Sequence, residues 1–154
     1  MKRSKPKFGD VLEISTAKGF AYFQYAHHDS EYGALIRVLP GVFEKRPGAF
    51  ADIVSQPERF FTFFPLAAAI NRGLVVVVGN EDIPRAAQKM PVMRAAGGID
   101  RTGKVLNWWI LEGANKTMVS LLSEEQQGLS IAEIVNDTLL AQRIVEGWSP
   151  SNRI

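Results

Sequence analysis

Two runs in the N-terminal part of the chain alternate apolar and polar side chains, and this period of two is the feature that most restricts how the chain can fold. Residues 11–16 and 32–39 show the alternation, which is typical of strands with one buried face. A third run between them, residues 20–26, is rich in aromatic residues and also predicts a strand. Short turn segments separate the runs, and strands joined by short turns pair antiparallel. The sequence therefore predicts an antiparallel meander of three strands.

The pairing of the first two strands can be predicted from burial. With Glu13 opposite Tyr22, the apolar residues of both strands lie on one face. A shift of one residue would instead place Gln24 beside Leu12. We therefore expect the register that pairs Glu13 with Tyr22.

Five further apolar runs predict strands in the rest of the chain. Residues 74–78 are apolar at every position, so we expect this strand to be covered on both faces. Residues 91–96 and 105–111 flank a glycine-rich loop and predict a second hairpin. The other predicted strands are residues 59–64 and 118–122, whereas residues 50–54 suit either a short strand or one turn of helix.

The best-marked element is a C-terminal helix. Ser130 and Glu133 have the spacing of a capping box, and Leu129 and Ile134 can form a hydrophobic staple. Gly147 follows the last helical position. A helical wheel predicts one apolar face made of Ile131, Ile134, Val135, Ala141 and Val145, with Leu140 and Ile144 on the opposite side.

These elements together predict an α+β domain over residues 8–148. We expect a strongly bent antiparallel sheet or partial barrel, with the C-terminal helix packed on it. A short helix is expected at residues 65–72, because Pro65 suits a first helical position and Gly73 a residue just past the end.

Residues 1–7 are expected to form a flexible basic arm. The chain has 18 basic and 16 acidic residues, and four of the basic ones lie in this arm. Without them 14 basic residues remain against the 16 acidic ones, so the predicted folded body is slightly acidic. A nucleic-acid-binding domain carries its basic face on the folded body. We therefore do not expect nucleic acid as a partner.

Composition also restricts catalysis and location. The chain has no cysteine, which excludes disulfides, thiolate zinc sites and cysteine nucleophiles. His27 and His28 are adjacent and would point to opposite faces of a strand, so they do not suit joint ligation of one metal. The glycines of residues 97–103 lack the Gly-Lys-Ser/Thr ending of a phosphate loop. We expect no catalytic, metal or cofactor site, and a cytoplasmic protein without a membrane partner, because no apolar run approaches the ~20 residues of a spanning helix.

Three aromatic residues are candidates for binding a partner protein. Trp108 and Trp109 are neighbours in a predicted strand, so one indole should face the core and the other the opposite side. Tyr22 lies on the polar face of the second strand. Exposed aromatic side chains of this kind are common in protein interfaces.

The order of these motifs resembles the immunity protein 26 family of bacterial polymorphic-toxin systems. The resemblance covers most of residues 8–146 and is carried by short motifs: Phe8 to Ile14, Gly19 to Gln24, Phe63-Phe64, Leu74 to Asn80, Ile83-Pro84, Asn136-Asp137 and Arg143-Ile144. It implies a protein that binds and neutralises a cognate protein toxin. The family is also grouped with a small phosphotriesterase, so a metal-assisted hydrolase is the alternative. A nucleic-acid-binding accessory domain is a third hypothesis.

Overall fold

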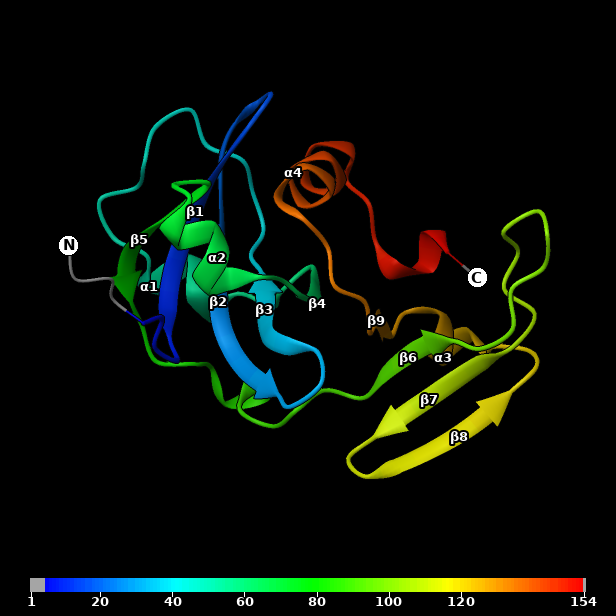
Figure 1. Cartoon of the computed structure of the whole chain (residues 1–154). Coiled ribbons are helices and arrows are strands. Elements are labelled where there is room, and N and C mark those ends of the chain that lie inside the picture. The colour runs from blue at the N-terminus through cyan, green and yellow to red at the C-terminus, as the bar shows by residue number, and fades with distance from the viewer. Residues whose placement is uncertain (1–4, 154) are drawn as a thin grey trace.

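Two sheets and four α-helices make up the computed structural model, which describes residues 5–153 (Figure 1). The first sheet is antiparallel with the order β4-β3-β2-β1-β5, and the second has the order β8-β7-β6-β9. The strands are β1 (Asp10–Thr16), β2 (Gly19–Asp29), β3 (Gly33–Val38), β4 (Phe60–Phe63), β5 (Val75–Asn80), β6 (Met93–Ala96), β7 (Trp108–Glu112), β8 (Asn115–Val119) and β9 (Ser130–Ile131). The helices are α1 (Ala51–Ser55), α2 (Leu66–Asn71), α3 (Glu124–Gln127) and α4 (Asp137–Glu146), with 3₁₀ turns η1 (Arg85–Ala87) and η2 (Pro150–Asn152).

The predicted α+β class is confirmed, with an antiparallel first sheet that does not close into a barrel. The first sheet stays open, and β6 to β9 form a second sheet in place of extending the first. The predicted short helix is present as α2. Residues 50–54, which suit either a strand or a turn of helix, lie mostly in α1. The last antiparallel strand is β8, which begins and ends three residues earlier than the predicted 118–122. Of the predicted arm, residues 1–4 lie outside the described residues.

The predicted register of the first hairpin is confirmed. Glu13 lies opposite Tyr22, and the strands are joined by the two residues between Thr16 and Gly19. Gly19 has a φ of 133°, which a residue with a Cβ rarely adopts, and an added Cβ would lie 2.5 Å from the carbonyl oxygen of Phe43. Glycine at this position therefore satisfies both the turn and the close approach of the neighbouring loop.

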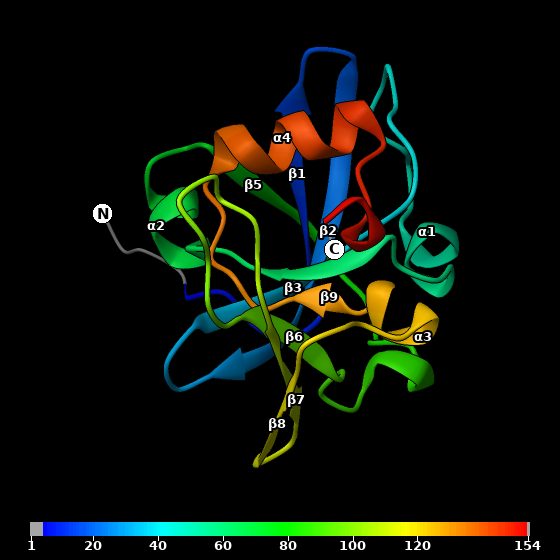
Figure 2. The same ribbon diagram turned by 90° about the vertical axis from the view of Figure 1, so that its right-hand side faces the viewer.

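The main core lies between the first sheet and α4, which crosses the sheet in Figure 2. Leu140 and Ile144 of α4 are buried in it at 0% and 3% exposure. Of the predicted apolar face, Ile131 and Val135 are buried at 5% and 2% exposure, although both precede the helix, whereas Ile134 is 57% exposed. Trp148, just after α4, packs edge-on against Phe60 of β4 with ring centroids 5.1 Å apart.

The C-terminal helix begins seven residues later than its predicted cap. Asn136 is the N-cap, and its side-chain oxygen accepts the backbone N–H of Leu139 at 2.8 Å. The predicted cap, Ser130, begins β9, and its hydroxyl oxygen accepts the backbone N–H of Phe61 at 2.9 Å. Gly147 ends the helix with a φ of 67°, as the sequence predicts.

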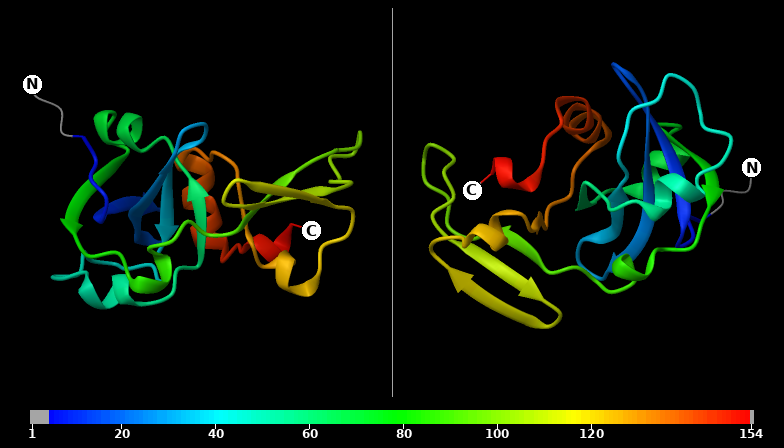
Figure 3. Two further views of the ribbon diagram at one scale, coloured as in Figure 1. Left: turned by 90° about the horizontal axis from the view of Figure 1, so that it is seen from below. Right: turned by 180° about the vertical axis from the view of Figure 1, so that it is seen from behind.

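The segment of residues 130–135 joins the two sheets. On one side it pairs in parallel with β6, where the N–H of Ala132 donates to the carbonyl oxygen of Arg94 at 2.8 Å. On the other side it runs beside β4, where the N–H of Val135 donates to the carbonyl oxygen of Phe63 at 3.0 Å. This segment therefore fixes how the second sheet, which projects to one side in Figure 3, is placed against the first.

The strand β5 is an edge strand, and the prediction that it is covered on both faces is wrong. Among the described strands only β1 pairs with it, and the register between them shifts at Val78. Val75 is buried, whereas Val76 and Val77 are 49% and 42% exposed. The five successive apolar residues 74–78 predict a central strand, but β5 lies at the edge of the first sheet.

Candidate functional site

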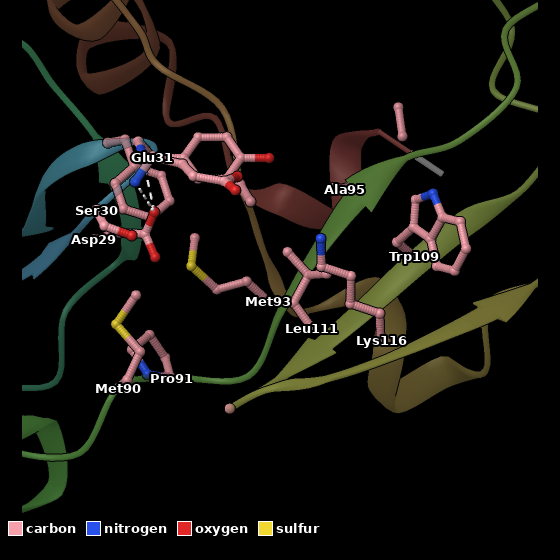
Figure 4. A pocket seen from close by; sticks show the side chains of 15 residues that line it. Asp29, Ser30, Glu31, Met90, Pro91, Met93, Ala95, Trp109, Leu111 and Lys116 are labelled. Atoms are coloured by element: carbon pink, nitrogen blue, oxygen red, sulfur yellow. Dashed lines mark hydrogen bonds between the residues drawn. The ribbon is translucent and has the colours of Figure 1, made fainter.

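A groove of about 500 Å³ lies between the tip of the β2–β3 hairpin and the second sheet. Figure 4 shows Asp29, Ser30 and Glu31 on one side of it and Trp109 on the other, with Met93 and Leu111 between them. The groove exists because the second sheet is held away from the hairpin at an angle and not stacked on it.

One face of the second sheet forms the floor and one wall of the groove. Strand pairing places Ala95 opposite Trp109, and Trp109 opposite Met118, so these three side chains share a face. The same face carries Met93 and Leu111, which are also directly opposite each other. Each of β6, β7 and β8 therefore contributes to one continuous apolar strip.

Small residues leave the strip uncovered. Ala95, Ala96, Ala132 and Gly113 all line the groove, and none of them has a side chain long enough to cover the indole of Trp109. Trp109 is consequently 37% exposed, although a large aromatic side chain gains most when it is buried. An uncovered indole above a floor of small residues is suited to insertion of a partner's side chain.

The opposite wall is rigid and acidic. Tyr32 stacks on Phe63 with ring centroids 4.7 Å apart and planes 15° apart. The carboxylate of Asp29 accepts the backbone N–H groups of Glu31 and Tyr32, each at 2.9 Å, and so fixes the turn. Glu31 is exposed at the tip, and no ion pair involves its carboxylate among residues 5–153. Lys116 of β8 lines the groove from the other side.

Methionines are concentrated at this groove. The chain has four of them, and Met90 and Met93 line the groove while Met118 lies on the same strip beside Trp109. Met90 and Met118 are 38% and 41% exposed. Methionine is flexible and polarisable, and it is common on surfaces that adapt to a bound partner.

The structure separates the three residues that the sequence singled out. Trp109 lies in the groove, whereas Trp108 is buried at 3% exposure on the other face of β7. The guanidinium carbon of Arg94 is 4.3 Å from the centre of the Trp108 ring. Tyr22 is 1% exposed and is therefore not a surface residue. Of the three candidates, only Trp109 can meet a partner without rearrangement of the core.

Tyr22 belongs to a buried polar group and not to an interface. Its hydroxyl donates to Oε2 of Glu13 at 2.8 Å. Arg46 donates to both carboxylate oxygens of Glu13, from Nε at 2.8 Å and from Nη2 at 2.9 Å. These bonds from Arg46 hold the pKa of the Glu13 carboxyl below its usual value. Burial, followed by the nearby carboxylate, raises the pKa of the Tyr22 hydroxyl far above its usual value.

Arg94 is the fully buried cation behind the groove. Its Nη2 donates to the carbonyl oxygens of Gln127 and Pro150 at 3.1 and 2.6 Å, and its Nε donates to that of Leu129 at 3.2 Å. Nη1 has no hydrogen-bond partner among residues 5–153. Burial, with Arg153 nearby, lowers the pKa of Arg94 to about 10. The side chain holds α3 and the C-terminal turn against β6.

The two histidines do not form a joint site. The ring nitrogen Nε2 of His27 lies 2.7 Å from the carbonyl oxygen of Ala87, whereas His28 is exposed and lines a separate shallow pocket beside α2. Within residues 5–153, no three histidine or carboxylate side chains come together in a way that could hold a metal ion. None of the helices in that same span is long and apolar enough to cross a bilayer.

Sequence reasoning found Trp109 but missed most of the groove. The tip of the β2–β3 hairpin and residues Met90 and Met93 carry no catalytic or ligand-binding motif, and they meet Trp109 only through the arrangement of the two sheets. The one signal that was available is the position of the three internal methionines, all near the second predicted hairpin.

Comparison with known proteins finds no match of the chain to a family model, to a curated protein or to a solved structure. The resemblance to the immunity protein 26 family therefore stays a hypothesis, and function has to be argued from the groove.

Proposed function

We propose that this chain is a bacterial immunity-type protein that binds and neutralises a cognate protein toxin, and that the groove beside Trp109 receives the toxin. The observation that carries the proposal is the exposed indole above small residues, with exposed methionines on the same strip. Aromatic residues and methionine are enriched in the centres of protein interfaces, and tryptophan is among the residues that contribute most binding energy there.

The charges at the rim support a protein ligand more than a small apolar one. Glu31 stands at one wall and Lys116 at the other, so a partner with complementary charges would be oriented across the apolar strip. The Tyr32–Phe63 stack and the turn fixed by Asp29 keep the acidic wall in place. A rigid wall loses little entropy on binding, and the methionines can adjust to the contour of the partner.

The proposal predicts that a toxin gene lies immediately upstream of the gene for this chain, and the toxic domain encoded there is the ligand for the test. Co-expression of the chain should relieve the growth arrest that this domain causes. Trp109→Ala should weaken binding of the purified domains by about 30-fold or more, the effect of losing a residue worth ~2 kcal/mol, as measured by calorimetry. Leu121→Ala is the matched control, because Leu121 is 86% exposed and does not line the groove.

Two results would reject the proposal. One is unchanged binding by the Trp109→Ala protein. The other is a wild-type chain that neither binds the neighbouring domain nor relieves its arrest. The hydrolase alternative predicts a different result: one tightly held metal ion per purified chain, lost on His28→Ala, together with hydrolysis of a phosphotriester.

A further inference from the structure

The outer edge of β5 is open and apolar. The strand lies at the end of the first sheet, and within residues 5–153 its only strand partner is β1. Residues Val75 to Val77 pair with β1 in regular register. Val76 and Val77 expose 49% and 42% of their surface, on opposite faces of the strand.

Such an edge is unusual in a protein that stays monomeric. Natural sheets protect their edges with charged residues, with proline or with covering loops, because unpaired N–H and C=O groups invite another strand to pair with them. In β5 the residues from Val75 to Val78 contain no charged residue and no proline, and the one protective device within residues 75–80 is the β-bulge at Val78. No backbone hydrogen bond joins residues 75–80 to any described segment other than β1.

Charges of opposite sign flank the strand. Arg72 precedes it, and Glu81 and Asp82 follow it. Arg72 and Asp82 are exposed, and none of the three side chains forms an ion pair within residues 5–153. The strand therefore has a positive end and a negative end, which is the pattern that favours antiparallel pairing with an identical strand.

We propose that β5 pairs with β5 of a second copy of this chain in an antiparallel manner, so that two first sheets join into one continuous sheet. Directly opposite residues of antiparallel strands share a face, and a two-fold axis perpendicular to the sheet keeps each face. Among the registers that satisfy both conditions, the one that sets Arg72 opposite Asp82 places Val77 opposite Val77 of the second copy and Val76 opposite Val78. It brings Arg72 of each copy to the same end as Glu81 and Asp82 of the other.

This interface is separate from the groove. In Figure 1 the strand β5 lies on one side of the molecule, and β7 and β8 lie on the other. No residue of β5 lines the groove. The dimer would present two grooves, and its formation and the binding of a toxin can be tested independently of each other.

The sharpest test uses cysteine cross-linking of the full chain. Because the chain has no cysteine, Val77→Cys introduces a single thiol, which the proposed axis sets directly opposite its own copy. Cβ atoms of opposite residues lie ~4.5–5.5 Å apart, within reach of a disulfide. Mild oxidation should rapidly give a covalent dimer. Val76→Cys should cross-link to Val78→Cys in a mixture and much more slowly to itself.

One control variant and one measurement on the wild type make the result decisive. Val42→Cys places a thiol at a valine of similar exposure, 37%, in the loop after β3, and should show only slow collisional cross-linking. Equal rates for Val77→Cys and Val42→Cys would overturn the proposal. So would a wild-type chain that sediments as a monomer at every concentration reached.

Charge exchange tests the ends of the interface. Arg72→Asp alone and Asp82→Arg alone should each shift the sedimentation equilibrium toward monomer, whereas the double variant should recover the dimer. Val77→Lys should abolish the dimer, since it places two ammonium groups opposite each other, while Val42→Lys should not. A dimer that persists with Val77→Lys would show that another surface makes it, and would also reject the proposal.

Discussion

Glu13 is the residue whose ionisation matters most for the stability of this fold. It is buried in the first sheet, accepts a hydrogen bond from Tyr22, and is held by two further bonds from Arg46. The exposed guanidinium thus compensates a carboxylate that lies inside the protein. A buried carboxylate is stable only when such partners satisfy it.

Stability should therefore fall in acid because of this residue. The pKa of Glu13 is lower in the folded chain than in the unfolded one, and the first cause is the bonding to Arg46. Its contribution is fully present above the unfolded pKa and is lost as pH falls through the folded pKa. We expect Glu13→Gln to cost about 1–3 kcal/mol at neutral pH and to approach the wild type in acid. Urea denaturation at several pH values measures the cost at neutral pH and its loss in acid. Glu44→Gln is the control, because Glu44 is exposed. If the free energies of unfolding of Glu13→Gln and the wild type differed by the same amount at every pH, Glu13 would not be the cause of the loss of stability in acid.

At the scale of elements, the C-terminal helix shows where sequence reasoning was misled. The Ser-x-x-Glu spacing at Ser130 is a capping-box pattern, yet backbone pairing with β4 and β6 takes up this segment as an extended strand. The hydroxyl of Ser130 and the carboxylate of Glu133 instead serve Phe61 and Arg143. Partners distant in sequence decided the conformation, and a local pattern cannot contain that information.

The corrected helix changes which side chains should matter. Leu140 is fully buried, whereas Ile134 is 57% exposed and precedes the helix. We expect Leu140→Ala to lower the free energy of unfolding by ~2–5 kcal/mol, as for other buried leucines. Ile134→Asp should change it by no more than about 0.5 kcal/mol, as at an ordinary surface position. Denaturant unfolding of the two variants measures the difference, and the reverse order would support the helical wheel and not the fold.

In the rest of the chain too, features that local sequence determines could be predicted, and features that depend on distant partners could not. The first hairpin was predicted with its register because the apolar pattern of its two strands, which is local, determines it. The alternation of Trp108 and Trp109 was predictable for the same reason. The edge position of β5 and the closeness of Glu31 to the second sheet were not, because the order of strands in a sheet depends on long-range pairing.

For the whole molecule, the groove depends on how firmly the two sheets are joined. The segment of residues 130–135 bonds to both, and Arg94 of β6 holds the C-terminal turn and the end of α3 by carbonyl contacts. Trp148 contacts both the main core and the apolar cluster behind the second sheet. Because side chains and backbone groups are shared in this way, we expect the two sheets to unfold as one cooperative unit.

Native-state amide exchange tests this cooperativity. In the wild type, the slowest amides of β2 and of β7 should exchange with the same free energy, because both open only by global unfolding. Ser130→Ala leaves the buried N–H of Phe61 without its acceptor, so it should lower both values together by about 1–3 kcal/mol. The matched control is Ser123→Ala, which removes the exposed N-cap of α3 and should cost about 1 kcal/mol or less.

The contrary outcome has a definite structural meaning. If the amides of β7 exchanged with a markedly lower free energy than those of β2, the second sheet would open while the first stayed folded. Trp109 and Met118 would then leave the hairpin tip at each opening, and the groove would be formed only part of the time. The apparent Kd for a partner in the groove equals the intrinsic Kd divided by the fraction of closed molecules. Affinity would therefore fall measurably only if the opening free energy of β7 were below ~1 kcal/mol, and only then would a stronger join between the sheets raise binding.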